Sequence, residues 1–531
     1  MVSNQAYETV NKEWKRTCKI ILGEELGELR DYEEWLLKGK EKMSVAEGNV
    51  VFATEDYPRN VRTASFDIVV MNKPFQKFSV NEIKDIDSIF GALEERDYCG
   101  SVVLGNSQNI ELSTNVTDSY NVYRSARIDN SKNIACSTIV RNAENAFGNN
   151  VTSLINYSIR CHQSGVNSSR GLDSVNIRGC ADFYYSYNCE NCNDVMFSVN
   201  LYAARNCIGN LELTKEKYTA LKKELLRQIA EKLRARQKVD TLPEILNRCE
   251  LGKEQIARTK KIAAEKGNAK ETEDMKAIEK CFSTTSRIVL GNELKGIDGY
   301  APWLKQHVLP VLEGNSVLAA EKISVPGYAN IQELNGKNFV SYGEFQGLIG
   351  KLRTTEKKLE GITFENIHEV MGDIAFVSPQ VRAGQNANII WCPIAISAVN
   401  CYNVLGAVYL KNSGYSVWSE GSDHLFACSF CIDSMFSIKS YQSKELKACF
   451  EVDSSRQSSS SYYCHNIENC NDSMFCFNAK NMNYAIGNTV VGPEKFKKVK
   501  SMLLEWINHE LEKNKSVPLS IFNLGEWKRN D

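Results

Sequence analysis

The sequence has little of several features that mark particular classes of protein. Lysine and arginine number 64 against 65 for aspartate and glutamate, which gives a formal net charge of −1. A basic excess, the electrostatic footprint of nucleic-acid or anionic-lipid binding, is therefore missing. Histidine is scarce, with six residues in 531. We expect neither a nucleic acid nor a membrane among the partners.

Long apolar runs are also missing. The longest, residues 389–399, falls far short of the roughly 20 residues that a membrane-spanning helix needs. Residues 1–9 are polar and do not resemble a secretory signal. We therefore expect the protein to fold in the cytoplasm, with a virion or an intracellular particle as its destination.

Familiar catalytic motifs are absent as well. The chain contains no phosphate-binding loop, no Gly-x-Gly-x-x-Gly, no Gly-x-Ser-x-Gly and no His-Glu-x-x-His. The sequence therefore predicts no catalytic residue, no cofactor and no enzyme. A hydrophobic share of 43% and an aromatic share of 9% are nevertheless typical of a folded protein, here of two to four domains.

The sequence does contain an internal duplication, and a repeat of this length constrains the fold of the whole chain. Ile-Ile-Leu-Gly-Glu-Glu-Leu at 20–26 returns as Ile-Val-Leu-Gly-Asn-Glu-Leu at 288–294, and Trp35 returns as Trp303, both at an offset of 303 − 35 = 268. Residues 184–197 return without gaps as residues 462–475, at an offset of 462 − 184 = 278. Collinear blocks at nearly constant offset predict a unit of roughly 270 residues written twice.

Each unit is expected to be of the α+β class. Residues 14–37 show apolar positions at helical spacing and predict an opening helix. A β-rich segment follows at 50–71 in the first copy and at 317–342 in the second. Short helices are then predicted at 80–93 and 364–371.

The distinctive part of each unit is a region rich in Asn, Ser and Cys, at about 120–210 and 402–488. Short apolar clusters recur there at intervals of roughly ten to fourteen positions, the spacing of brief strands joined by turns. Cys-Ile-Asp-Ser-Met-Phe at 431–436 nearly repeats at 470–475, an offset of 470 − 431 = 39. This pattern favours a β-solenoid, with Asn at corners and Cys inside. An antiparallel β-sandwich or a meander is the alternative.

A helix is predicted to close each region. In the first copy Thr214 is a plausible N-cap and the apolar stripe consists of Tyr218, Leu221, Leu225, Ile229 and Leu233. In the second copy Pro493 begins a helix with the stripe Phe496, Val499, Leu503, Ile507 and Leu511. The predicted organisation is a first unit at 1–212, a charged helical closing and linking segment at 213–280, a second unit at 281–490, and a closing helix with a tail at 491–531.

Three strings of the first copy resemble a known group of proteins. They are Cys-Glu-Asn-Cys-Asn-Asp at 189–194, Asn-Cys-Ile at 206–208 and Thr-Lys-Glu-Lys-Tyr at 214–218. The group consists of uncharacterised cysteine- and asparagine-rich repeat proteins of candidate-phylum bacteria and environmental viruses. The resemblance covers the β-rich repeat regions and their closing helices, less than half of the chain, and the group's N-terminal zinc module has no counterpart here. It implies a repeat architecture and no activity.

Two Cys-x-x-Cys pairs are the candidate metal ligands: Cys189 with Cys192, and Cys428 with Cys431 near His424. Structural zinc needs four ligands, commonly two such pairs. The second copy, however, has Ile467 at the position of Cys189. A core position tolerates that exchange and a ligand position does not. Core packing is therefore the favoured interpretation, and zinc is the alternative.

Two further sets of residues are conceivable sites. Cys161-His162 and Cys464-His465 are adjacent in sequence, and neighbouring side chains on a strand point to opposite faces, so neither pair is predicted to be a nucleophile with its base. The pairs Tyr184-Tyr185 and Tyr462-Tyr463 would offer an aromatic face to polysaccharide. Stacking within the β-region is the favoured interpretation of these tyrosines.

These observations together predict a non-enzymatic structural protein that self-assembles as a homo-oligomer, in the manner of a viral capsid or particle-shell component. The duplication, the repetitive β-structure and the missing catalytic motifs all favour this function. A binding module for a carbohydrate or a protein partner is the first alternative. A zinc-dependent or cysteine hydrolase is the second.

Overall fold

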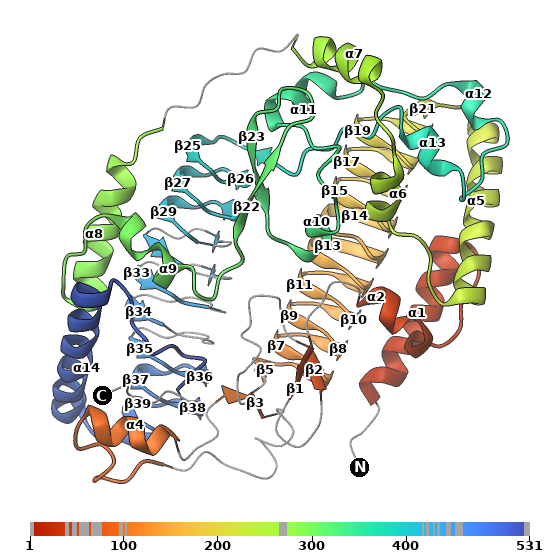
Figure 1. Ribbon diagram of the computed structural model, residues 1–531. Coiled ribbons are helices and arrows are strands. Elements are labelled where there is room, and N and C mark those ends of the chain that lie inside the picture. The colour runs from red at the N-terminus through yellow and green to blue at the C-terminus, as the bar shows by residue number, and fades with distance from the viewer. Residues whose placement is uncertain are drawn as a thin grey trace.

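A computed structural model describes most of the chain. The described residues are 5–37, 42–44, 50–52, 63–64, 77–94, 99–100, 103–264, 273–416, 419–420, 424–427, 431–432, 436–441, 448–451 and 460–524. The fold is of the α+β type, with large and mostly parallel sheets flanked by helices (Figure 1). Within the described ranges, no helix combines the length and the apolar character that crossing a membrane requires.

Residues 103–212 form a series of short strands stacked on one another by hydrogen bonds, which we call the first stack (Figure 1). Its strands are β5 (Val103–Leu104), β6 (Gln108–Glu111), β7 (Thr114–Thr117), β8 (Tyr120–Tyr123), β9 (Ala126–Asp129), β10 (Lys132–Ala135), β11 (Thr138–Arg141), β12 (Glu144–Phe147), β13 (Asn150–Ile159), β14 (Gly165–Leu172), β15 (Val175–Arg178), β16 (Ala181–Tyr184), β17 (Tyr187–Glu190), β18 (Asn193–Met196), β19 (Val199–Tyr202), β20 (Arg205–Ile208) and β21 (Leu211–Glu212).

The described residues between 381 and 490 form a second set of mostly parallel strands, which we call the second stack. Its described strands are β24 (Val381–Ala383), β25 (Ala387–Ile390), β26 (Ile394–Ile396), β27 (Val399–Tyr402), β28 (Gly406–Val408), β29 (Lys411–Gly414), β30 (Ser419–Glu420), β31 (Leu425–Phe426), β32 (Cys431–Ile432), β33 (Phe436–Ile438), β34 (Ala448–Phe450), β35 (Ser461–Tyr462), β36 (His465–Glu468), β37 (Asn471–Met474), β38 (Phe477–Lys480), β39 (Asn483–Ile486) and β40 (Thr489–Val490).

Strand pairing within the stacks is parallel, except that the last strand of each, β21 and β40, pairs antiparallel with the strand before it. Lys132 of β10 lies opposite Tyr120 of β8 on one side and Glu144 of β12 on the other, so the chain returns to the same edge at an offset of 144 − 132 = 12. We call these twelve residues one layer. Val399 and Lys411 pair at the same separation in the second stack. The antiparallel alternative is therefore wrong for the stacks. The near-repeat between Cys431 and Cys470 has an offset of 39 residues, which is three layers of twelve residues plus three. It is therefore not a whole number of layers.

The sharp bends of each layer explain its composition. Every third residue has a positive φ, as at Asn115 (56°), Asp118 (46°) and Asn121 (56°). Asn and Asp adopt this left-handed conformation at lower cost than other non-glycine residues. Every third side chain also points inward, and the buried Ser119 and Val122 are examples. Small and apolar residues therefore fill a narrow interior, while Asn side chains form ladders such as Asn121 Nδ2 to Asn133 Oδ1 (2.9 Å).

A helix lies along each stack. α1 (Gln5–Leu22) contacts the first stack, and α8 (Lys276–Leu290) contacts the second. Both end at glycines in the left-handed conformation, Gly23 (φ 86°) and Gly291 (φ 77°). The single helix predicted at 14–37 is therefore wrong: after Gly23 the chain forms η1 (Leu29–Tyr32) and α2 (Glu33–Leu36). The boundary predicted at 280/281 falls inside α8.

The closing helices agree with the prediction. They are α5 (Lys215–Arg236) and α14 (Pro493–Asn514). Thr214 caps α5 by accepting a hydrogen bond from the Lys217 N–H (3.3 Å), and Pro493 is the first residue of α14. The α14 stripe is buried throughout, and in α5 only Leu221 is partly buried.

The remaining elements connect and cover the stacks. Residues 317–342, predicted as β-rich, contain one strand and then a short helix, while most of 50–71 lies outside the described residues. The elements are β1 (Lys42–Ser44), β2 (Val50–Phe52), β3 (Thr63–Ala64), α4 (Ile86–Glu94), β4 (Cys99–Gly100), α6 (Leu242–Arg248), α7 (Lys253–Ala263), η2 (Ile297–Tyr300), α9 (Ala301–Leu304), β22 (Val311–Asn315), β23 (Lys322–Pro326), α10 (Ala329–Gln332), α11 (Tyr342–Leu348), α12 (Glu356–Leu359) and α13 (Ile367–Met371).

The two stacks run in opposite directions, and each half of the chain covers the last layer of the other half's stack (Figure 1). At the end of the first stack, the Thr354 N–H donates to the Gly209 carbonyl (2.9 Å). At the end of the second, the Phe78 N–H donates to the Gly487 carbonyl (2.9 Å). Gly209 and Gly487 are equivalent positions, because 487 − 209 = 278. We call this arrangement reciprocal closure.

Aromatic packing accompanies reciprocal closure on both sides. Phe364 of the second half lies edge-on to Tyr185 of the first stack, with ring centroids 5.4 Å apart. Phe90 of the first half lies edge-on to Phe475 of the second stack (6.3 Å) and to Trp506 of α14 (5.5 Å). Neither half therefore completes its own core.

Candidate functional site

Cys189 and Cys192, the first candidate metal pair, lie inside the first stack. Both are buried, with 1% and 0% of their surface exposed. The Cys189 thiol contacts the carbonyls of Tyr187 (3.6 Å) and Ser198 (3.8 Å), and burial raises its pKa well above the ordinary value. Because every third residue points inward, the Cys-x-x-Cys spacing equals the spacing of interior positions.

The second candidate pair is placed only in part. Cys428 lies outside the described residues, and Cys431 is buried and disulfide-bonded. His424 lies with its Nε2 3.2 Å from the sulfur of Cys281 on α8, a residue that the sequence does not single out. Across the part of the chain that the structure describes, no three His, Cys, Asp or Glu side chains gather in a way that would hold a metal ion.

The other sequence candidates are also interior. Cys161 is fully buried, and burial raises the pKa of its thiol. His465 is buried with its Nε2 2.9 Å from the Ile521 carbonyl. The tyrosines proposed as a polysaccharide-binding face are at most 3% exposed: Tyr184, Tyr185, Tyr462 and Tyr463. The favoured interpretation of these tyrosines, packing within the β-region, therefore matches their burial.

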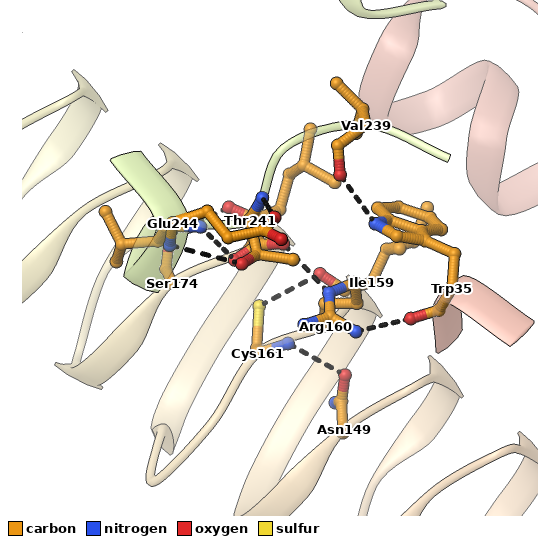
Figure 2. A network of polar contacts seen from close by, with 12 residues as sticks. Trp35, Asn149, Ile159, Arg160, Cys161, Ser174, Val239, Thr241 and Glu244 are labelled. Atoms are coloured by element: carbon orange, nitrogen blue, oxygen red, sulfur yellow. Dashed lines mark hydrogen bonds and ion pairs between the residues drawn. The ribbon is translucent and has the colours of Figure 1, made fainter. Parts of the chain in front are cut away.

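A buried ion pair in the first stack forms a network that sequence reasoning missed (Figure 2). Arg160 and Asp173 are 1% and 0% exposed, and the Arg160 Nε lies 2.9 Å from an Asp173 carboxylate oxygen. The Arg160 Nη1 donates to the Trp35 carbonyl (2.5 Å), and the indole of Trp35 donates to the Val239 carbonyl (3.1 Å). The Leu242 N–H donates to Asp173 (2.9 Å). The network thus joins α2, the first stack and the chain after α5.

The second half contains a counterpart of this network. Lys439 and Glu451 are both 0% exposed and lie 3.5 Å apart. The Lys439 ammonium sits 5.2 Å from the ring of Trp303, the equivalent of Trp35, and the Ile521 N–H donates to Glu451 (3.0 Å). Burial raises the pKa of the Glu451 carboxyl and lowers that of Lys439. Both ion pairs are closed to solvent, so we assign them a structural role and not a catalytic one.

An open concavity of about 250 Å³ lies between the first stack and the second half of the chain, and we call it the junction pocket. The first stack contributes charged, amide and aromatic side chains to it, and α11 with the start of β24 forms the opposite wall. The lining residues are Asn176, Arg178, Asn188, Cys189, Glu190, Leu201, Tyr202, Tyr342, Phe345, Gln346, Ile349, Gln380, Val381 and Arg382.

The walls of the junction pocket are held by hydrogen bonds. A capping box between Ser341 and Glu344 starts α11, and the Tyr342 N–H donates to the side chain of Gln380 (2.9 Å). The Arg382 Nη1 donates to the carbonyls of Val381 (3.1 Å) and Pro393 (2.9 Å), and its guanidinium lies 5.8 Å from the Tyr342 ring centroid.

On the facing wall, Arg178 and Glu190 are register partners on adjacent strands, and Tyr202 pairs with Glu190 one layer further on. Arg178 is half-buried, and burial lowers the pKa of its guanidinium, while the nearby Glu190 favours the charged form. Glu190 is exposed, and Tyr202 is 60% exposed. The pocket thus combines charged and amide groups with aromatic rings on both of its walls.

Comparison of the chain with protein-family models, with curated proteins and with solved structures finds no match.

Proposed function

We propose that this chain is a non-enzymatic structural protein that assembles with copies of itself, as a particle shell such as a viral capsid does. Reciprocal closure is the observation that supports the proposal. A stack whose last layer is covered by the protein's own chain does not present that edge for pairing with another molecule. The molecule then behaves as one rigid block, and copies of it meet along the sides of the stacks.

We also propose a fold type for the two stacks and an origin of the chain by duplication. Each stack is a β-solenoid with twelve-residue layers, and the two halves derive from one duplicated unit. The parallel pairing at twelve residues and the equivalent buried ion pairs beneath Trp35 and Trp303 support this view.

A contact between copies would use exposed apolar side chains on a stack. Leu154 and Val166 follow a register pair of β13 and β14, so they lie one layer apart, and they are 45% and 54% exposed. Burying apolar surface yields roughly 25 cal/mol per Å². We assign this pair to the contact between copies.

Light scattering coupled to size-exclusion chromatography, with electron microscopy of the eluted species, tests the assembly. The unmodified chain is expected to form a species larger than a monomer as concentration rises. Leu154→Glu with Val166→Glu is expected to leave monomers. Val490→Glu, which charges an apolar residue that is 66% exposed elsewhere, is the matched control and should still assemble. A chain that remains monomeric at every concentration contradicts the proposal.

A second candidate function, a binding module, is favoured by the junction pocket. It brings a half-buried arginine, an exposed carboxylate and aromatic rings from both halves of the chain into one concavity. Such a combination of apolar walls and a few convergent polar groups is typical of ligand sites.

A further inference from the structure

The Arg178 guanidinium is a half-buried cation in the lining of the junction pocket. Among the described residues, no side chain forms a hydrogen bond or an ion pair with it. Burial has removed part of its hydration, as the lowered pKa indicates. A partly desolvated guanidinium presents a planar fork of donors that fits the two oxygens of a carboxylate. The pocket therefore favours an anionic group at this end.

Arg382 adds a second guanidinium to the same pocket. Its Nη1 is occupied by two backbone carbonyls, which fix the orientation of the side chain. Its guanidinium lies 5.8 Å from the Tyr342 ring centroid, so its positive charge is held at the aromatic wall of the pocket. Two arginines that line one concavity favour a full negative charge over a neutral hydrogen-bonding group.

The remaining lining indicates what else the ligand contains. The rings of Tyr342 and Phe345 form an apolar wall, and Tyr202 is exposed at the rim. Glu190 is a carboxylate that accepts hydrogen bonds from hydroxyl groups. Its negative charge would repel a second anionic group. The pocket volume, about 250 Å³, is below the roughly 300–1,000 Å³ of sites for drug-sized ligands. One small ring with one carboxylate and several hydroxyls fits this lining.

The equivalent position of the second stack is closed, which sets the junction pocket apart from the duplicated scaffold. Glu468 corresponds to Glu190, because 468 − 190 = 278. It is 9% exposed, accepts a hydrogen bond from the Gly105 N–H (2.8 Å) and pairs with Lys480 (3.7 Å). Glu468 in the second stack thus has a hydrogen bond and an ion pair within the protein, whereas the equivalent Glu190 in the first stack faces the junction pocket.

We propose that the junction pocket binds a single carboxylate-bearing sugar unit, a uronate. Its carboxylate lies between Arg178 and Arg382, its ring stacks on Tyr342, and its hydroxyls donate to Glu190. This inference rests on the second candidate function, the binding module, and is independent of self-assembly.

Isothermal titration calorimetry of the full chain with sodium glucuronate tests the proposal, with glucose, acetate and N-acetylglycine as comparison solutes. Glucuronate is expected to bind saturably with one site per chain, at least tenfold more tightly than any of the other three. Arg178→Met is expected to weaken glucuronate binding at least tenfold. Arg205→Met, which removes an exposed arginine of the same stack, is the matched control and should bind as the unmodified chain does.

Each alternative outcome overturns the proposal in a distinguishable way. Equal binding of acetate indicates a general anion site, and tighter binding of N-acetylglycine indicates a peptide carboxylate; both keep the binding module and reject the uronate. Binding of none of the four solutes to a chain that melts normally rejects the uronate and removes the support for the binding module. Glucuronate binding that Arg178→Met does not change places the site elsewhere. Thermal unfolding of both variants, alongside, shows whether Arg178→Met has lost the fold; if it has, Arg382→Met takes its place.

Discussion

At the scale of single residues, the two buried ion pairs are the most consequential feature. Arg160 with Asp173 and Lys439 with Glu451 are removed from solvent, and each lies beneath an equivalent tryptophan. Removing charges from water is costly, and the mutual attraction roughly offsets that cost only while both partners are present. The pairs therefore fix which segments meet more than they raise stability.

Substitutions at Lys439 and Glu451 test this view. Glu451→Leu leaves an uncompensated buried ammonium and is expected to lower the free energy of unfolding by about 3–5 kcal/mol. Lys439→Met is expected to have a similar effect. The double variant should recover most of the loss, less about 1–3 kcal/mol for the Ile521 N–H that loses its acceptor.

Urea unfolding followed by tryptophan fluorescence measures these differences. Lys322→Met, which breaks an exposed ion pair with Glu313 (2.9 Å), is the matched control and should change stability little. A double variant as unstable as the sum of the single variants would show that the two charges do not act as a pair.

At the scale of the elements, each stack depends on hydrogen bonds made inside its own narrow interior. The Ser125 hydroxyl donates to the Tyr123 carbonyl (2.9 Å) and accepts from the Ser137 N–H (3.1 Å), one layer further on. Cys180 takes the same role later in the stack: its thiol contacts the Arg178 carbonyl (3.2 Å), and the Cys192 N–H approaches its sulfur (3.2 Å). Serine and cysteine are therefore equivalent inward residues at the bends.

Ser125→Ala tests the interior hydrogen bonds. It leaves the buried Ser137 N–H without its acceptor and is expected to cost about 1–3 kcal/mol of stability. Ser125→Cys keeps a weak acceptor at the same place and should cost less. Ser169→Ala, at a half-buried serine of the same stack that makes none of these contacts, is the control for chemical denaturation. Equal losses for alanine and cysteine at position 125 would contradict the equivalence.

At the scale of the whole molecule, reciprocal closure makes the two halves depend on each other. A Cβ atom at Gly487 (φ 52°) would lie 2.2 Å from Cγ of Phe78, which comes from the other half of the chain. At Gly350, whose φ is also positive (66°), a Cβ atom would meet nothing within 4 Å. Substituting Gly350 therefore tests backbone strain alone, whereas substituting Gly487 tests backbone strain together with the loss of the Phe78 contact.

Gly487→Ala is accordingly expected to destabilise the protein more than Gly350→Ala does. Both variants pay roughly 1–2 kcal/mol for the left-handed backbone, but only the first displaces Phe78. Hydrogen exchange read by mass spectrometry should show faster exchange at the Phe78 amide in Gly487→Ala and unchanged exchange there in Gly350→Ala. Similar exchange in both variants would mean that Phe78 does not seal the second stack.

Part of the architecture could be predicted because it depends on short, contiguous stretches of the sequence. The apolar stripe of α14 and the cap at Thr214 depend on neighbours a few residues away. The interior role of Cys189 followed from its replacement by Ile467 in the second copy. The layer length could not be predicted from the near-repeat between Cys431 and Cys470, because inward positions recur every third residue and similar segments need not lie a whole number of layers apart.

The sequence by itself therefore determined the closing helices and the small-residue interior, since both follow from local periodicity and from the small and apolar residues that recur along the chain. Only the tertiary structure decided which half closes which stack, which charges meet in the core and where a pocket stays open. The contacts responsible join residues far apart in sequence, such as Phe78 with Gly487, Leu242 with Asp173 and Gly105 with Glu468. Such partners are selected by how two complete surfaces fit together, and no local pattern along the chain specifies that fit.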